Sequence, residues 1–182
     1  FESFLESLSS RKRKNIRKER ASVVDAGVAI QALTGTEIKS NHMDHFYAFY
    51  LSTIDRKWGG AYLTRGFFDI VHATMAEQIL LVMAWHDGDL IGGALNFIGA
   101  DTLYGRNWGA STHIQNLHFE VCYYQAIVFA IEHKLRCVEA GAQGFHKVQR
   151  GYLPVPTYSA HWIAHEGFRS AVEQFLDAES RG

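Results

Sequence analysis

Several side chains able to move protons or hold anions fall close together in the second half of the chain. Glu139 ends an apolar stretch and is followed by a glycine-containing loop over residues 141–144. A carboxylate at a strand end could act as a base; alternatively, Glu139 caps or salt-bridges a basic helix. His146 titrates near neutrality and could relay a proton, while Lys147 and Arg150 could hold an anionic substrate. The alternative for these last three residues is an ordinary solvated helical turn.

A second distinctive segment is the basic decade, residues 11–20. It carries seven Lys and Arg residues against one Glu, in a chain whose net charge is −1, so the remainder of the chain is acidic. Such a segment is a candidate anion-binding element, and the alternative is a solvated helix whose charge serves solubility alone. Because Ile16, Val23 and Val24 are its few apolar residues, we expect only the ends of this helix to dock on a core.

Length and composition exclude several classes of protein. The chain has 182 residues, of which 47% are hydrophobic and 20% charged. These proportions exclude intrinsic disorder, a collagen-like repeat and a disulfide scaffold. The longest apolar runs, 79–85 and 90–95, are too short to span a bilayer, and no signal-peptide pattern opens the chain. Cys122 and Cys137 lie in apolar stretches without CxxC spacing, so we expect buried thiols in a reducing, cytoplasmic compartment.

The sequence predicts neither a metal site nor a covalent nucleophile. His161 and His165 straddle the end of an expected strand, where a spacing of four separates side chains. His42 and His45 lack the carboxylate partner of a metal-binding motif. The sequence has no Gly-x-Ser-x-Gly motif, and neither cysteine has the local signature of a catalytic thiol.

Hydrophobic spacing predicts alternating helices and strands. The strongest local signal is Asp87-Gly88 between two apolar runs, which is typical of a β-hairpin. The cleanest amphipathic pattern predicts a helix over 117–135. The residues expected to face the sheet from this helix are Leu117, Val121, Val128 and Ile131. The expected elements are helices 1–8 and 9–25, strand 27–33, helices 43–58 and 67–75, strands 79–85, 90–98 and 102–108, helix 117–135, strands 136–140 and 157–163, and a terminal helix around 168–175. This order predicts an α/β fold with a mixed, largely antiparallel sheet flanked by helices.

The order of these elements resembles that of the GNAT acyltransferases, and short strings resemble narrower groups. The basic helix leading into Ala26-Gly27-Val28 is similar to the Fem-type peptidoglycan aminoacyl transferases. The chain is closer still to the bacterial peptidoglycan biosynthesis/recognition family of N-acyltransferases. The strings that carry this resemblance are Gly105-Arg106-Asn107-Trp108-Gly109, Leu117 to Gln125, Glu139 to Gly144, His146-Lys147, Arg150-Gly151-Tyr152 and Thr157 to Trp162. The resemblance implies a longer protein whose C-terminal half has a helical segment at 1–26 and a GNAT-like domain at 27–182.

Two departures from the family pattern bear on the chemistry. Phe145 stands where the family usually has an acidic residue, which removes one candidate base. The string Arg106-x-x-Gly109-x-Ser111 is a near match to the Q/R-x-x-G-x-G/A loop, with which GNAT enzymes hold the pyrophosphate of acetyl-CoA. Acyl-CoA and aminoacyl-tRNA therefore both stay open as the donor substrate.

The resemblance implies transfer of an acyl or aminoacyl group to an amine in peptidoglycan or cell-wall metabolism. Such a reaction needs a base for the amine proton and donors for the oxyanion. Glu139 or His146 would accept the proton, Gln143 and Tyr158 would position the acceptor, and Glu139, His146 and Tyr158 would line one cleft. The residues implied to hold the anionic part of the donor are Lys12, Arg13, Arg17 and Arg106. The alternatives are a non-catalytic module that binds a cell-wall or other anionic ligand, and a nucleic-acid binder that acts through the basic helix.

Overall fold

One five-stranded sheet forms the centre of the protein. The computed structural model describes residues 1–55, 60–141, 144–156 and 158–181. The strands lie in the order β1 (Ala29–Leu33), β2 (Ile79–His86), β3 (Asp89–Ile98), β4 (Thr102–Ala110) and β5 (Cys137–Glu139). The first four are antiparallel neighbours, and β5 pairs with β4 in parallel. The mixed sheet and the predicted meander over 79–108 are confirmed, and the hairpin turn places Asp87 and Gly88 at φ values of 52° and 89°.

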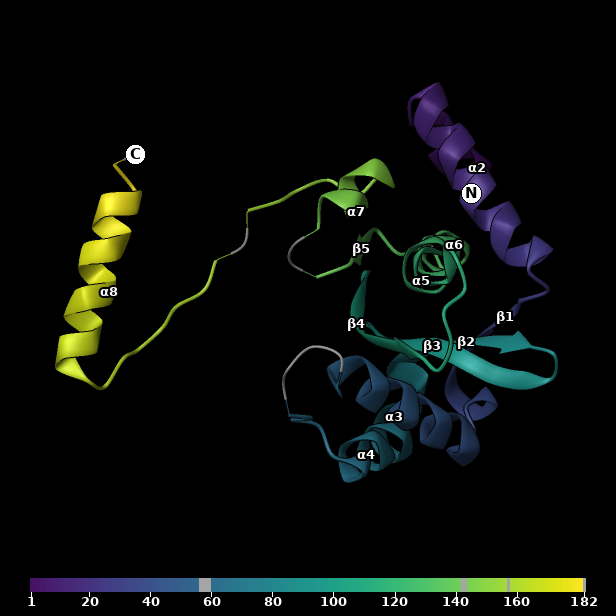
Figure 1. Ribbon diagram of the computed structural model, residues 1–182, viewed down its shortest axis with the longest axis horizontal. Helices are drawn as coiled ribbons and strands as arrows, with labels where there is room; N and C mark the ends of the chain where they lie inside the picture. The colour runs from purple at the N-terminus through teal and green to yellow at the C-terminus, as the bar shows by residue number, and fades with distance from the viewer. Residues whose placement is uncertain (56–59, 142–143, 157, 182) are drawn as a thin grey trace.

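Helices cover both faces of this sheet (Figure 1). One face carries α3 (Ser40–Asp55) and α4 (Arg65–Met75); the other carries α5 (Leu117–Phe119), the π-helical turn η3 (Glu120–Tyr124) and α6 (Gln125–Glu132). The remaining elements are α1 (Glu2–Glu6), α2 (Ser10–Asp25), the 3₁₀ turns η1 (Gly35–Glu37) and η2 (Ala76–Gln78), α7 (Phe145–Gln149) and α8 (Glu166–Glu179). The predicted α/β architecture is therefore confirmed.

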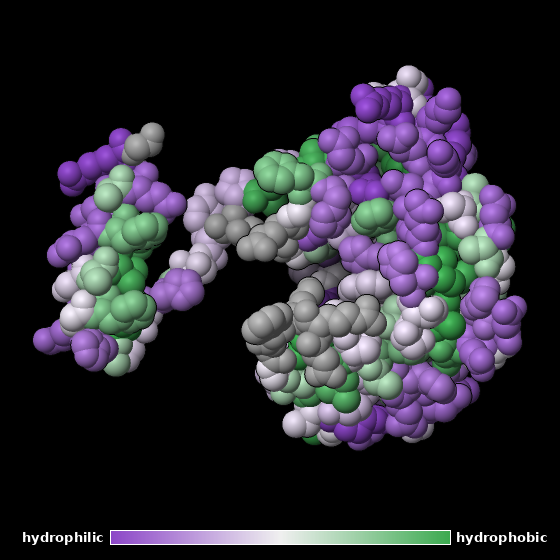
Figure 2. Space-filling model, in the orientation of Figure 1, coloured by the Kyte–Doolittle hydropathy of each residue, from purple (hydrophilic) through white to green (hydrophobic). Residues whose placement is uncertain are grey.

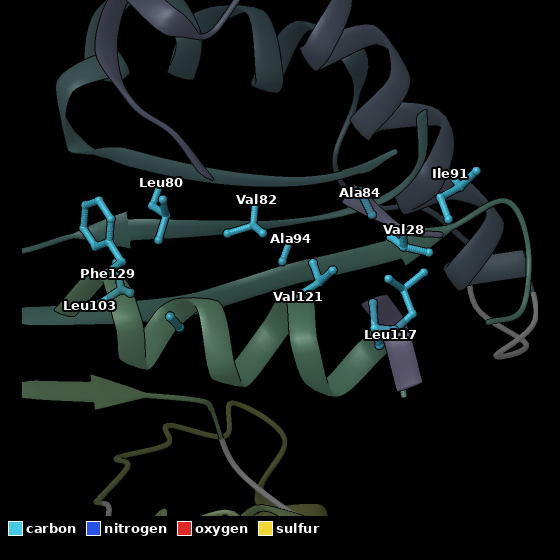
Figure 3. Close-up of a cluster of buried hydrophobic side chains, with 12 residues drawn as sticks. Val28, Leu80, Val82, Ala84, Ile91, Ala94, Leu103, Leu117, Val121 and Phe129 are labelled. Atoms are coloured by element: carbon cyan, nitrogen blue, oxygen red, sulfur yellow. The ribbon is translucent and has the colours of Figure 1, made fainter. Parts of the chain in front are cut away.

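The core is built on both sides of β2. Leu80 and Val82 pack toward α5 and α6, as Figure 3 shows, whereas Leu81 and Met83 pack against α3 and α4. Successive side chains of a strand point to opposite faces. Because both faces of β2 are covered, the strand reads as a continuous apolar run in the sequence.

The long amphipathic helix is present, but its inward face is not the predicted one. Leu117 and Val121 are buried as expected, whereas Val128 is only partly buried and Ile131 is 44% exposed. The cause is η3, because a π turn accommodates an extra residue and rotates the residues that follow it. Phe129 accordingly lies in the core cluster.

The C-terminal segment departs furthest from the prediction. A strand was predicted at 157–163, but residues 158–163 contain no strand, and Thr157 lies outside the described residues. Residues 56–58, the predicted end of the helix at 43–58, also lie outside the described residues. The predicted terminal helix exists as α8, but it buries no residue and leaves Phe168 and Phe175 more than half exposed. An extended segment separates it from the sheet (Figure 1).

Two further sequence-based expectations concern the cysteines and membrane spans. Cys122 is partly buried, but Cys137 is exposed, so the prediction that both thiols are buried is wrong for Cys137. Cys137 stands on the short edge strand β5, where every second side chain points away from the helix-covered core. Within the part of the chain that the structure describes, no helix has the length and apolar character needed to cross a membrane.

Candidate active site

The candidate site lies where the pairing between strands β4 and β5 ends. The two strands pair only over Thr102–Tyr104 and Cys137–Glu139. Beyond this point, β4 pairs with β3 alone among the described strands. A cavity of about 130 Å³ lies there, and its walls come from β3, β4, the π turn and the residue after β5. The residues that line it are Ala94, Leu95, Asn96, Gly105, Arg106, Asn107, Trp108, His118, Cys122, Tyr123 and Ala140.

A β-bulge forms one wall of this cavity. Leu95 pairs with Asn107, whereas the next residue, Asn96, pairs with Gly105, so Arg106 is an extra residue in β4. A bulge bends its strand and re-aims nearby side chains, and bulges are frequent beside active sites. Arg106 is exposed beside the cavity and donates a hydrogen bond of 2.9 Å from Nη2 to the hydroxyl of Tyr62.

The opposite wall comes from the second irregularity, the π turn. Cys122 and Tyr123 belong to this turn, and His118 lies in α5, two residues before the turn begins. The His118 ring lies 4.6 Å from the ring of Trp108 and 5.2 Å from that of Tyr123, measured between centroids. Isolated π turns inside helices are often found at functional sites. Burial raises the pKa of the Cys122 thiol, which keeps this side chain protonated.

Tyr123 connects the cavity to His146. Its hydroxyl lies 2.9 Å from Nε2 of His146, a hydrogen bond whose direction depends on the imidazole tautomer. Burial raises the pKa of Tyr123 to about 12, so this phenol is neutral near pH 7. Burial, followed by the nearby cations Arg150 and Lys147, lowers the pKa of His146, so its imidazole is neutral as well. A neutral phenol and a neutral imidazole in contact can pass a proton between them.

Asn107 has a buried side-chain oxygen without a partner in the part of the chain that the structure describes, on the face of the sheet that α3 and α4 cover. Its Oδ1 is buried and has no hydrogen-bond partner among the described residues. Leaving such an atom unpaired costs about 1–3 kcal/mol, and buried polar atoms usually have partners. The neighbouring Asn96 differs, because its Nδ2 donates to the carbonyl of Leu80 at 3.2 Å. Asn107 pairs with Leu95, whose side chain packs with α3 and α4, so this oxygen lies on the other face of the sheet from Tyr123 and is not offered to a ligand beside that residue.

The structure places Glu139 away from this cavity. Val138 packs toward the helix-covered core that contains Val121, and side chains alternate along a strand, so Glu139 points to the opposite face of the sheet. Glu139 is exposed and makes no ion pair with any described residue. Tyr158 is 94% exposed, so it does not share a cleft with Glu139 and His146. Gln143 lies outside the described residues.

Lys147 holds the loop that follows β5. Its Nζ donates to the carbonyl of Ala140 at 2.6 Å and to that of Gly141 at 3.0 Å. Burial lowers the pKa of this ammonium group. Lys147 is thus close to the cavity through Ala140, and its nearest acceptors belong to the protein's own main chain.

The basic decade divides into an inner and an outer set. The inner set, which is half-buried, includes two of the predicted anion ligands: Lys12 donates to the carbonyl of Val148 at 3.0 Å and Arg13 to that of Leu8 at 2.6 Å. The outer set, which is exposed, consists of Arg11, Lys14, Arg17 and Lys18, and Arg17 pairs there with the Glu2 carboxylate. Figure 2 shows a strongly hydrophilic surface over α2.

Two carboxylates anchor α2 and neighbouring elements through arginines. Arg20 donates from Nε and Nη2 to Glu120, whose side chain is 5% exposed. Arg150, predicted to hold substrate, donates from Nε and Nη2 to Glu19 and is itself only 8% exposed. A hollow of about 310 Å³ beside α1 and α2 is lined by Arg17, Arg20 and Glu120, whose charges are paired within the protein.

The string that nearly matches a pyrophosphate loop has a structural explanation. Gly109 lies inside β4, and a Cβ on it would stand 2.0 Å from the carbonyl oxygen of Phe49 in α3. The Ser111 amide and hydroxyl both donate to the carbonyl of Ile91. Residues 111–116 then separate the strand from Leu117, where α5 begins. Gly109 therefore allows β4 to pack closely against α3, and the amide of Ser111 is already engaged in a hydrogen bond to Ile91 of β3.

Sequence reasoning did not single out Asn107, Cys122 or Glu19. A possible signal for Asn107 was Gly105-Arg106-Asn107, where three residues of low apolar character interrupt a strand pattern. For Cys122 and Glu19 no local signal existed, because both become notable only through residues far away in the sequence.

Comparison with protein families gives one match over the whole chain. The FemAB-like family model, described as peptidoglycan biosynthesis/recognition, matches residues 1–182. No curated protein matches the chain.

Solved structures show the same fold. An aminoglycoside acetyltransferase from an uncultured soil metagenomic sample, in complex with sisomicin, has a TM-score of 0.55 and 9% identity, covering 79% of this chain and 99% of that one. A conserved protein of unknown function from Bacteroides thetaiotaomicron has a TM-score of 0.55 and 18% identity, with 85% of this chain and 54% of that one covered. An aminoglycoside N-acetyltransferase in complex with CoA has a TM-score of 0.50 and 10% identity, with coverages of 76% and 95%. At these identities the likeness shows the fold, that of the GNAT acetyltransferases.

Proposed function

Since the chain belongs to the FemAB-like family of peptidoglycan biosynthesis/recognition proteins, we propose that its cavity between β4 and β5 transfers an acyl or aminoacyl group to an amine. It is an N-acyltransferase-like protein by family and fold. The observation that carries the proposal is the cavity itself, where a bulged strand without a β5 partner faces the Tyr123–His146 pair. The amine would belong to a cell-wall precursor.

The Tyr123–His146 pair supplies the proton transfers of this reaction. The amine nitrogen forms a bond to the acyl carbonyl carbon and loses a proton to Oη of Tyr123, while the phenol proton passes to Nε2 of His146. The bond from the carbonyl carbon to the leaving group then breaks. The proton returns from His146 through Tyr123 to the leaving oxygen or sulfur, so the pair ends the cycle unchanged. Because both groups are neutral near pH 7, the pair is ready to accept a proton.

The parted strand supplies donors for the negative charge that develops on the acyl oxygen. Beyond Tyr104, the β4 main chain on the β5 side has no strand partner among the described residues, and Gly105 to Asn107 line the cavity. Preorganised backbone N–H groups at such a position stabilise an oxyanion, typically with an effect of 10²–10³-fold on kcat for one donor. This role needs no titratable side chain.

One feature bears on the donor. The Gly109–Ser111 segment is occupied by packing and sheet hydrogen bonds, which argues against a GNAT-type grip on the coenzyme A pyrophosphate. We therefore favour an aminoacyl donor such as aminoacyl-tRNA over acyl-CoA. Arg106, exposed at the rim, is placed to hold the anionic part of the donor.

A donor and acceptor screen tests this proposal. The purified protein is incubated with glycyl- or alanyl-tRNA, or with acetyl-CoA, in the presence of an amine-bearing wall precursor, and amide formation is followed by mass spectrometry. Amide formed from the aminoacyl donor and reduced by Tyr123→Phe supports the proposal. Amide formed only from acetyl-CoA overturns the donor assignment.

A binding module for a cell-wall ligand is the second candidate. It is favoured by one observation: no Asp or Glu lines the described cavity. Precursor binding by calorimetry without turnover of any donor would support this candidate and overturn catalysis.

A further inference from the structure

The five-residue helix α7 carries His146 and depends on outside contacts for its position. A helix this short is not stable by itself in water. Arg150, at its C-terminal end, donates from Nη1 to the carbonyl of His146 at 2.8 Å. The same guanidinium donates from Nε and Nη2 to the carboxylate of Glu19 in α2, at 3.0 and 2.7 Å. One planar group therefore joins the basic helix to the main chain of His146.

The surroundings of this ion pair hold the guanidinium in one orientation. The Arg150 side chain is 9% exposed and that of Glu19 is 21% exposed. The centre of the guanidinium lies 3.3 Å from the ring centroid of Phe119. The hydroxyl of Tyr124 donates to Oε2 of Glu19, so the carboxylate is held as well. Since the guanidinium is a rigid fork, a carboxylate that binds two of its nitrogens also fixes the direction of the third.

We propose that Glu19 is a positioning residue, which acts through Arg150 to set His146 against the hydroxyl of Tyr123. This inference rests on the proposed function, because acyl transfer is what requires that contact. The basic helix thereby acquires a role different from anion binding: its one acidic residue within the decade orients the active-site helix. A displacement of His146 by about 1 Å would lower turnover by as much as roughly 10²-fold, because proton transfer requires hydrogen-bond distance.

The test compares two neutralising variants of adjacent residues in α2. Glu19→Gln breaks the ion pair that reaches α7, whereas Arg20→Gln breaks the other ion pair of α2 with a buried carboxylate, that of Glu120. Among the described residues, the side chain of Glu120 forms hydrogen bonds and ion pairs with Arg20 and Gln125, neither of which belongs to α7. Two-dimensional NMR of the His146 imidazole reports its hydrogen bond and titration without any substrate, and thermal unfolding reports stability. Where the wild type turns over a donor, kcat and KM are measured separately.

We expect both variants to lower the melting temperature but only Glu19→Gln to change the His146 imidazole signals. Its titration should move to lower pH, because Arg150, without its carboxylate, then repels the imidazolium more strongly; Lys147, His118 and Tyr123 face the ring unchanged. We also expect kcat to fall roughly 10- to 100-fold with little change in KM. His146 signals that are unchanged in Glu19→Gln, or altered alike in both variants, would overturn the proposal.

A milder variant keeps the proposal testable if Glu19→Gln does not fold. Tyr124→Phe removes one hydrogen bond to Glu19 while leaving the ring and both charges in place. It should move the His146 signals in the same direction by a smaller amount, and unchanged signals would refute the proposal. The NMR result is independent of turnover, so a protein that uses no donor would contradict the proposed function without touching this inference.

Discussion

Replacing Gly109 by Ala tests whether this glycine is needed for packing or for binding a ligand. An added Cβ would stand 2.0 Å from the carbonyl oxygen and 2.3 Å from the carbonyl carbon of Phe49, and 2.9 Å from Oγ1 of Thr53. Real Cβ atoms do not approach backbone this closely, so α3 would have to move away from β4 by more than 1 Å. Overpacking of this kind typically costs 1–3 kcal/mol, and a backbone obstacle gives a value near the upper end, about 3 kcal/mol.

The loss is measured by urea unfolding and by thermal melting. For a chain of this size, about 3 kcal/mol corresponds to a fall in melting temperature of roughly 6–12 °C. Gly66→Ala is the matched control, because Gly66 is exposed in α4 and its nearest contact to an added Cβ is 3.7 Å. This control should raise stability by a few tenths of a kcal/mol up to about 1 kcal/mol, since Ala favours helix more than Gly.

The reasoning fails if Gly109→Ala unfolds like the wild type. A stable variant that has lost affinity for acetyl-CoA would be the specific refutation, because it would show that the glycine serves close approach to a phosphate. The packing of Gly109 against Phe49 leads us to expect the reverse, a clear loss of stability.

Three further predictions address the core, the proton relay and pH. Val121→Asp should lower the free energy of unfolding by several kcal/mol, measured in urea, because it buries an unpaired charge, whereas Ile131→Asp at the 44% exposed position should change it by about 0.5 kcal/mol or less. Tyr123→Phe should lower kcat roughly 10²-fold in a donor assay while Tm stays within a few degrees, and normal turnover would remove the phenol from the mechanism. With respect to His146, the free energy of unfolding should be flat well above pH 6.5 and should fall as the pH drops through 6.5, because only the unfolded chain then takes up the proton. The unfolding free energy of His146→Asn should fall less steeply between pH 7.5 and 5.5, and identical slopes would contradict the lowered pKa.

The sequence alone determined the features that depend on near neighbours. Asp87-Gly88 predicted the hairpin because both residues tolerate positive φ, which the turn requires. The uninterrupted apolar run of β2 predicted a strand, which the structure buries on both faces. Hydrophobic spacing predicted the order of most elements, and that order together with the family strings indicated the acyltransferase fold.

Tertiary structure decided which residues form the site. The alternating spacings of four and three after Leu117 predicted one continuous stripe, but the π turn, where Glu120 is drawn to Arg20, rotates the second half of the helix. Two irregularities shape the cavity, this turn and the bulge at Arg106, and the hydrophobic spacing predicted neither.

The basic helix shows the physical reason most clearly. Local composition made the seven cations a candidate anion-binding element, yet Lys12 binds Val148 and Arg20 binds Glu120, which lie 136 and 100 residues away in the chain. Glu19 and Arg150 are 131 residues apart in the sequence, and they form an ion pair because the fold places α2 beside the end of α7. Charge pairing across such distances depends on where the fold places each helix, and that placement is a property of the packed core as a whole.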